Sequence, residues 1–131
     1  MRVQQILVMV DFSEGSNTAI GEAARIARGQ GATVQLVHAY GPRGVVPEDT
    51  FVENAKIASD RLAAAVERLS AEGVSASGEI HPGSALEAFE AVEDAMAPDL
   101  VVVGARGASR IRALLLGSVA RAVVDHAFAV L

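Results

Sequence analysis

The stretch that most constrains this chain covers residues 100–119, LVVVGARGASRIRALLLGSV. It opens with an uninterrupted apolar run rich in valine, which is typical of a strand buried on both faces of a sheet. A segment punctuated by glycines follows, and residues 119–126 then have the pattern of a short helix. Glycines let a backbone come close to a ligand, and the free amides and dipole at a helix start favour an anion. The order strand, glycine loop, helix N-terminus therefore predicts a cradle for a phosphate chain.

The charge pattern of the same stretch favours this interpretation. Between Gly104 and position 121 the basic residues are Arg106, Arg110, Arg112 and Arg121, and no acidic residue lies among them. Of the 11 basic residues, seven remain for the rest of the chain against all 16 acidic ones, so that part has a net charge of −9. The glycine segment is thus a local positive island in an acidic protein. The alternative is a surface loop whose arginines face solvent and whose glycines only make turns.

Along the whole chain, apolar runs typical of strands alternate with amphipathic patterns typical of helices. Strands are predicted over residues 3–10, 33–40, 74–81 and 100–103, and helices over residues 17–30, 50–72, 84–96 and 119–126. Thr50 with Glu53, and Ser84 with Glu87, have capping-box spacing at two helix starts. Strand 74–81 is the least apolar and is expected near an edge. The alternation predicts an α/β fold, a three-layer open sheet of mostly parallel strands with about four helices on its two faces.

Length and composition favour one globular domain over residues 1–131. Cysteine is absent, which excludes disulfides and thiolate chemistry, and the first residues lack a signal-peptide pattern. No run approaches the roughly 20 apolar residues that span a membrane. We therefore expect a cytoplasmic protein that does not bind membranes. A net charge of −5, with Lys56 as the only lysine, also argues against general binding to nucleic acid.

The glycine segment resembles the signature of a known family. That signature is glycine, two residues, glycine, nine residues, glycine and then serine or threonine, and it belongs to the universal stress proteins of the ATP-binding subclass. The matching residues are Gly104, Gly107, Gly117 and Ser118. The segment VDFSEGS around Asp11, the strand end VHA and the turn at Pro82 and Gly83 are similar to the same family in the same order. The resemblance covers nearly the whole chain.

The resemblance implies a strand order of 3-2-1-4-5, with Asp11 and Gly104 facing one cleft at the switch point of the sheet. Asp11 would contact the nucleoside, the backbone of Ala39 would lie beside the adenine, and loop amides with Ser118 and Arg106 would hold the phosphates. The expected nucleotide-binding residues are Asp11, Ala39, Gly104, Arg106, Gly107, Gly117, Ser118 and Val119. The expected ligand is ATP, alone or with Mg²⁺, and no residue is expected to be catalytic or to ligate a metal.

Asp11, and also His38, which is not among these residues, have structural interpretations as well. Asp11 can cap the turn that follows it, although Ser13 and Ser16 can serve as caps instead. His38 lies on a predicted strand without a partner at ligand spacing, and a lone strand histidine is usually structural.

Catalytic motifs are missing from the sequence. Neither a P-loop signature with its lysine nor a GxGxxG occurs, and the adjacent pairs Glu48–Asp49 and Glu93–Asp94 are typical of solvated surface. We therefore expect a regulatory stress-response protein that binds adenine nucleotide and at most hydrolyses ATP slowly. A nucleotide-independent dimeric interaction module and a weak ATPase remain as alternatives, and a flavin domain of related architecture has no motif here.

The end of the chain departs from the family pattern. Family members finish with a proline-containing turn and a longer fifth strand that often pairs across a dimer, whereas residues 126–131 here are HAFAVL. The fifth strand is therefore expected to be short or absent. A homodimer is still expected, because an exposed apolar edge favours association.

Overall fold

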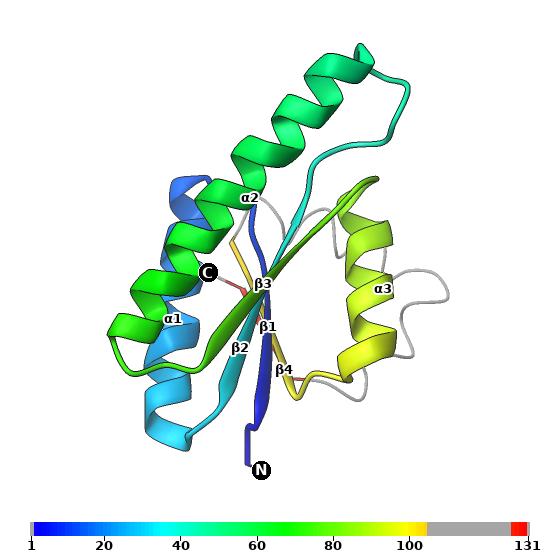
Figure 1. Ribbon diagram of the computed structural model, residues 1–131. Coiled ribbons are helices and arrows are strands. Elements are labelled where there is room, and N and C mark those ends of the chain that lie inside the picture. The colour runs from blue at the N-terminus through cyan, green and yellow to red at the C-terminus, as the bar shows by residue number, and fades with distance from the viewer. Residues whose placement is uncertain (1, 105–126, 131) are drawn as a thin grey trace.

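The computed structural model describes residues 2–104 and 127–130. In chain order it contains β1 (Gln5–Met9), α1 (Glu14–Gln30), β2 (Thr33–Ala39), α2 (Glu48–Ala71), β3 (Ala76–His81), α3 (Ala85–Met96), β4 (Leu100–Val103) and β5 (Ala127–Val130) (Figure 1). The predicted alternation of strands and helices is confirmed over this part of the chain. The helix predicted over residues 119–126 lies outside the described residues.

The strands of the described chain form one sheet in the order β3-β2-β1-β4-β5, and every neighbouring pair is parallel. β1 is central, so that Ile6 lies opposite Val34 of β2 on one side and Leu100 of β4 on the other. β3 is at one edge, as its lower hydrophobicity predicted, and β5 is at the other. The order 3-2-1-4-5 is confirmed. The fifth strand, expected to be short or absent, is present and four residues long.

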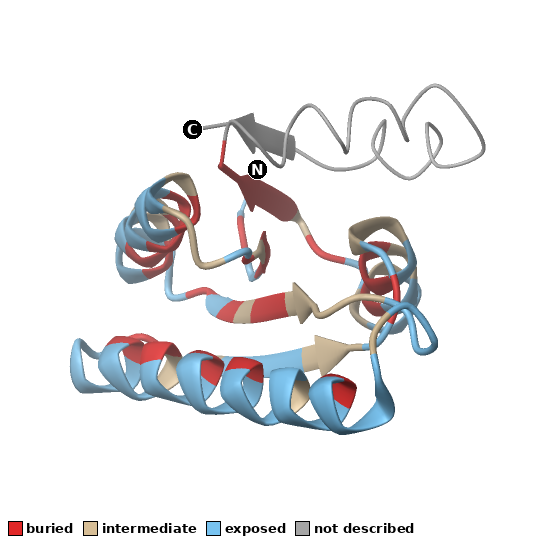
Figure 2. Ribbon diagram, turned by 90° about the horizontal axis from the view of Figure 1, so that it is seen from above, coloured by how far each residue is buried: buried red, intermediate tan, exposed pale blue. Residues whose placement is uncertain are grey.

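Helices cover both faces of this sheet, α1 and α2 on one face and α3 on the other (Figure 1). Alternate strand residues divide between the two cores: Ile6 and Val8 pack with α1 and α2, whereas Leu7 packs with α3. Phe89 of α3 is fully buried in the second core, and burial of such a side chain contributes roughly 1.5–3 kcal/mol. β4 is buried at all its positions (Figure 2), as its uninterrupted valine run predicted.

Two helices begin earlier in the chain than their patterns predicted. α2 begins at Glu48 after Pro47, which makes no side-chain capping bond, so the capping box predicted for Thr50 and Glu53 is wrong. Proline is tolerated at this N-cap because its carbonyl accepts the first helical hydrogen bond, from the Phe51 N–H at 2.9 Å, and the N–H that it lacks lies outside the helix. The acidic Glu48 and Asp49 favour the positive end of the helix dipole. α1 begins at Glu14 rather than residue 17, with Ser13 as its N-cap.

Candidate functional site

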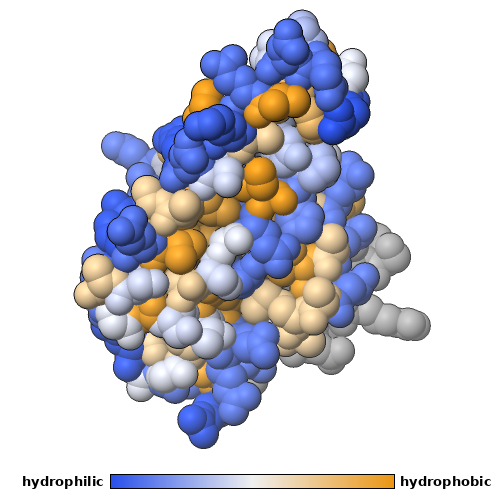
Figure 3. Space-filling model, in the orientation of Figure 1, coloured by the Kyte–Doolittle hydropathy of each residue, from blue (hydrophilic) through white to orange (hydrophobic). Residues whose placement is uncertain are grey.

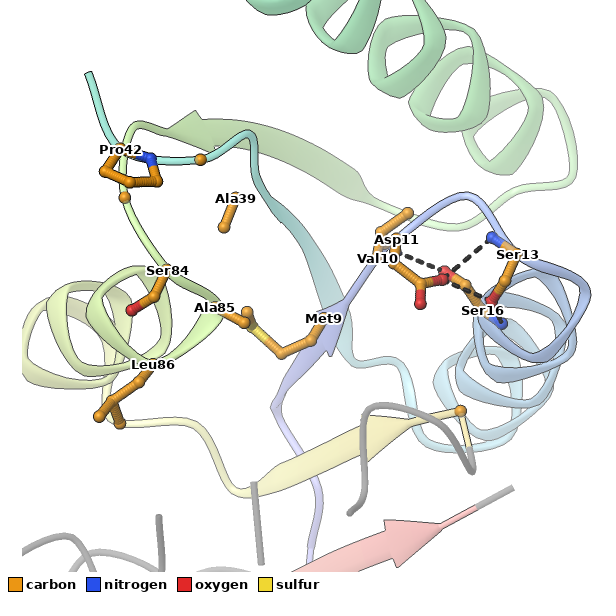
Figure 4. Close-up of a pocket in the computed structure, with 13 residues that line it drawn as sticks. Met9, Val10, Asp11, Ser13, Ser16, Ala39, Pro42, Ser84, Ala85 and Leu86 are labelled. Atoms are coloured by element: carbon orange, nitrogen blue, oxygen red, sulfur yellow. Dashed lines mark hydrogen bonds between the residues drawn. The ribbon is translucent and has the colours of Figure 1, made fainter. Parts of the chain in front are cut away.

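A pocket of about 480 Å³ opens at the carboxyl ends of β1, β2 and β4 (Figure 4). Both α1 and α3 begin at its rim. The pocket lies where the chain leaves β1 for β2 on one side while β4 flanks β1 on the other, and ligands of open α/β sheets bind at such switch points. Its lining residues are Met9, Val10, Asp11, Ser13, Ser16, Ala39, Gly41, Pro42, Gly83, Ser84, Ala85, Leu86 and Gly104.

One wall of the pocket is the turn between β1 and α1, which is stabilised by hydrogen bonds among Asp11, Ser13 and Ser16 (Figure 4). Asp11 Oδ1 accepts hydrogen bonds from the hydroxyl of Ser13 and, at 3.0 Å, from its backbone N–H. Ser13 Oγ accepts from the Ser16 N–H at 3.2 Å, and Ser16 Oγ accepts from the Asp11 N–H at 3.1 Å. The structural interpretation of Asp11 as a turn residue is thus confirmed, and the same bonds fix its carboxylate at the pocket.

Gly104 brings the end of β4 against this wall. A Cβ atom at this position would lie 2.7 Å from the carbonyl carbon of Gly15, 2.9 Å from its oxygen and 3.1 Å from the nitrogen of Ser16. These are backbone atoms at the start of α1, which cannot move aside as a flexible side chain can. Gly104 is therefore required by the close approach of two backbones, and that approach places Gly104 itself beside the N-terminus of α1.

The opposite wall is built from two backbone segments that are distant in sequence. Gly41, after β2, and Gly83, after β3, exchange hydrogen bonds, with N–H to oxygen distances of 3.1 Å from Gly41 and 2.8 Å from Gly83. Gly83 has φ of +113°, a conformation that L side chains rarely adopt. Pro42 and the first turn of α3 complete this wall, facing Asp11 across the pocket (Figure 4).

The start of α3 is fixed by the capping box that the sequence predicted. Ser84 Oγ accepts from the Glu87 N–H at 3.2 Å, and Glu87 Oε1 accepts from the Ser84 N–H at 3.1 Å. Two helix N-termini, those of α1 and α3, therefore bring their partial positive charge to the rim of one pocket. In residues 2–104 and 127–130, no group of three or more histidines and carboxylates is placed to hold a metal ion.

The structure brings together three of the predicted site residues, Asp11, Ala39 and Gly104, around this pocket. The other five, Arg106, Gly107, Gly117, Ser118 and Val119, lie outside the described residues. Sequence reasoning did not assign the wall that faces Asp11, although the Pro82–Gly83 turn and the capping box marked its place. Met9 and Leu86 were also missed, because their apolar side chains are indistinguishable in sequence from core residues.

Comparison with known proteins identifies the chain. The model of the universal stress protein family matches residues 2–129. This chain belongs to the universal stress protein family. The search among curated proteins gave no significant match. No helix in the described part of this universal stress protein is both long and apolar enough to cross a membrane.

Solved structures of other universal stress proteins have the same fold. One from Burkholderia pseudomallei superposes with a TM-score of 0.79 at 18% identity, over 99% of this chain and 96% of that one. A universal stress protein in complex with cAMP has a TM-score of 0.69 at 28% identity, covering 100% of this chain and 97% of that one. The Archaeoglobus fulgidus protein in complex with dAMP has a TM-score of 0.65 at 23% identity, covering 99% and 98%.

Proposed function

We propose that this universal stress protein is a regulatory protein that binds an adenine nucleotide, with ATP as its ligand. The observation that carries the proposal is the pocket at the switch point of the sheet, where Asp11, Ala39 and Gly104 meet. The family relationship supports the proposal, because one relative was solved with cAMP and another with dAMP. The triphosphate is proposed from the glycine motif of the sequence.

The pocket fits the nucleoside half of such a ligand. Its volume of about 480 Å³ lies within the range of roughly 300–1,000 Å³ typical of small-molecule sites. The Met9 and Leu86 side chains supply apolar surface for a flat base (Figure 4). An ionised carboxylate has about four lone-pair sites, so Asp11 can accept from a ribose hydroxyl in addition to Ser13. Ala39 offers the base only its backbone and a methyl group, which leaves room beside the ring.

The phosphate half is proposed to run from Gly104 along the segment that follows it. Gly104 lies against the N-terminus of α1, where backbone amides and the helix dipole favour anions. Arg106, Gly107, Gly117, Ser118 and Val119 remain predicted ligands of the phosphates, with Mg²⁺ as a companion ion. Without a lysine or a general base in the motif, binding rather than hydrolysis is the proposed activity.

We also propose that the protein acts as a homodimer in the cytoplasm. Among the described strands, β5 has a neighbour on one side only, and we propose that a second copy pairs with its other edge. Gel filtration with light scattering tests this arrangement.

The first experiment is the ultraviolet spectrum of freshly purified protein, followed by thermal melts with ATP, ADP, AMP and GTP in the presence of Mg²⁺. The chain has no tryptophan and one tyrosine, so a retained adenine would dominate the spectrum. ATP at about 100 times its dissociation constant should add about 2.7 kcal/mol of stability. With an unfolding entropy of about 0.28 kcal/mol/K for 131 residues, this raises Tm by roughly 10 °C. A protein without bound adenine whose Tm no nucleotide moves would replace this proposal by the nucleotide-independent interaction module.

A further inference from the structure

A second cavity, of about 330 Å³, lies at the same end of the sheet but against α2. Its lining residues are Phe12, His38, Ala39, Tyr40, Asn54, Ile57, Ala58 and Arg61. Ala39 lines this cavity and the pocket described above, so one strand end separates the two. The proposed nucleotide function uses none of the other residues that line it.

The α2 side of the cavity is one face of the helix. Asn54, Ile57, Ala58 and Arg61 recur at spacings of three and four residues, which places them together along the helix. Ile57 is 50% exposed, one of three large hydrophobic residues left open to solvent in the described chain. Figure 3 shows apolar side chains between hydrophilic ones over α2. A ligand in the cavity would remove part of this apolar surface from water.

Arg61 provides the charge of the cavity. Its guanidinium carbon lies 4.3 Å from the centroid of the Phe12 ring, so the ring supports the flat cation by a cation–π contact. In the described part of the chain, Arg61 makes no ion pair with a carboxylate, whereas Arg25, Arg28 and Arg43 each pair with a glutamate. A guanidinium stacked by its face keeps its N–H donors at the edge, in the fork geometry that fits a carboxylate.

Phe12 is held in place by an uncommon backbone conformation and by His38. Its φ is +63°, which a non-glycine residue adopts at a cost of roughly 1–3 kcal/mol when the surrounding structure demands it. The Phe12 and His38 rings lie 4.5 Å apart, and His38 Nδ1 is 2.7 Å from the Val10 carbonyl oxygen. Because a carbonyl oxygen only accepts hydrogen bonds, His38 Nδ1 carries a proton and donates it to Val10, the residue that follows β1. Strain of this kind concentrates at functional sites.

We propose that this cavity binds a small organic carboxylate with a short apolar body. The carboxylate forms a bidentate pair with Arg61, and the apolar body covers Ile57 and Ala58. The lining favours this chemistry over a phosphate, because it presents one arginine and no lysine among mainly apolar and neutral groups. The two arms of the site come from α2 and from the segment beside Asp11, so the ligand bridges α2 to the turn that lines the first pocket.

The test uses Tyr40, the only tyrosine in a chain without tryptophan, as a fluorophore that lines the cavity itself. Hexanoate is titrated into the nucleotide-free protein, with hexanamide as the neutral analogue and inorganic phosphate as the anion without an apolar body. Arg61→Gln removes the charge. Arg68→Gln is the matched control, because Arg68 lies on the same helix and lines a neighbouring groove that shares Phe12 and Arg61 with the cavity but none of its other residues. Circular dichroism checks that both exposed-site variants are folded.

Hexanoate should change the Tyr40 emission saturably and raise Tm, whereas hexanamide and phosphate should do neither. Arg61→Gln should weaken hexanoate binding at least tenfold, and Arg68→Gln should leave it unchanged. No saturable response, or equal hexanoate affinity in the wild type and Arg61→Gln, would overturn the proposal. An equal response to phosphate would overturn the apolar part, and loss of binding in Arg68→Gln would move the site to the neighbouring groove. None of these outcomes depends on whether the first pocket takes a nucleotide.

Discussion

Replacing Gly104 by alanine tests whether the close approach of β4 to α1 builds the nucleotide pocket. The new Cβ would lie 2.7 Å from the Gly15 carbonyl carbon, whereas non-bonded carbons rest at roughly 3.5–4.0 Å. The backbones must therefore separate by about 1 Å. Overpacking of this kind costs typically 1–3 kcal/mol, which for 131 residues lowers Tm by roughly 4–11 °C. Because α1 carries one pocket wall, ATP binding should weaken as well.

Gly21→Ala provides the matched control. Gly21 lies within α1, and a Cβ atom there meets nothing within 4 Å. Alanine is the better helix former, so this variant should gain roughly 0.5–1 kcal/mol. Both free energies of unfolding are measured by urea denaturation followed by circular dichroism. A change of less than about 0.5 kcal/mol in Gly104→Ala, the scale of neutral surface substitutions, would refute the close-approach argument.

Three further predictions concern the pocket rim and one surface ion pair. Asp11→Ala should abolish the ATP-induced rise in Tm; an unchanged rise measured by calorimetry would leave Asp11 with its turn role alone. Ser84→Ala should lose about 1 kcal/mol in urea unfolding, because the Glu87 N–H loses its cap; equal stability would contradict the capping box. The hydrogen bond from Arg25 lowers the pKa of Glu22 below its ordinary value. The contribution of this ion pair to the free energy of unfolding is complete above the ordinary pKa of glutamate and is lost as pH falls through the lowered pKa of Glu22. In low salt, Glu22→Gln should therefore make the free energy of unfolding less dependent on pH in this acidic range.

Much of the fold was predictable because its signals are local. The valine run of β4 requires burial on both faces, and the Ser84–Glu87 spacing fixed the start of α3 without any tertiary information. The start of α2 was predicted wrongly. The Thr50–Glu53 spacing matches a capping box, but the helix already begins at Glu48, after Pro47. Periodicity could not give the strand order, which came only from the resemblance and which the structure confirms.

Some features of the candidate site were likewise predictable from the sequence, and others were not. By itself, the sequence determined that an acidic chain would carry a glycine-rich, arginine-bearing segment after a buried strand, and that Asp11 would end another strand. Only the tertiary structure decided that Gly41 bonds to Gly83 and that Arg61 stacks on Phe12, because these partners are 42 and 49 residues apart and meet only through the strand order. A motif such as the glycine segment can be recognised from neighbouring residues, whereas a pocket wall depends on which strands lie side by side in the sheet.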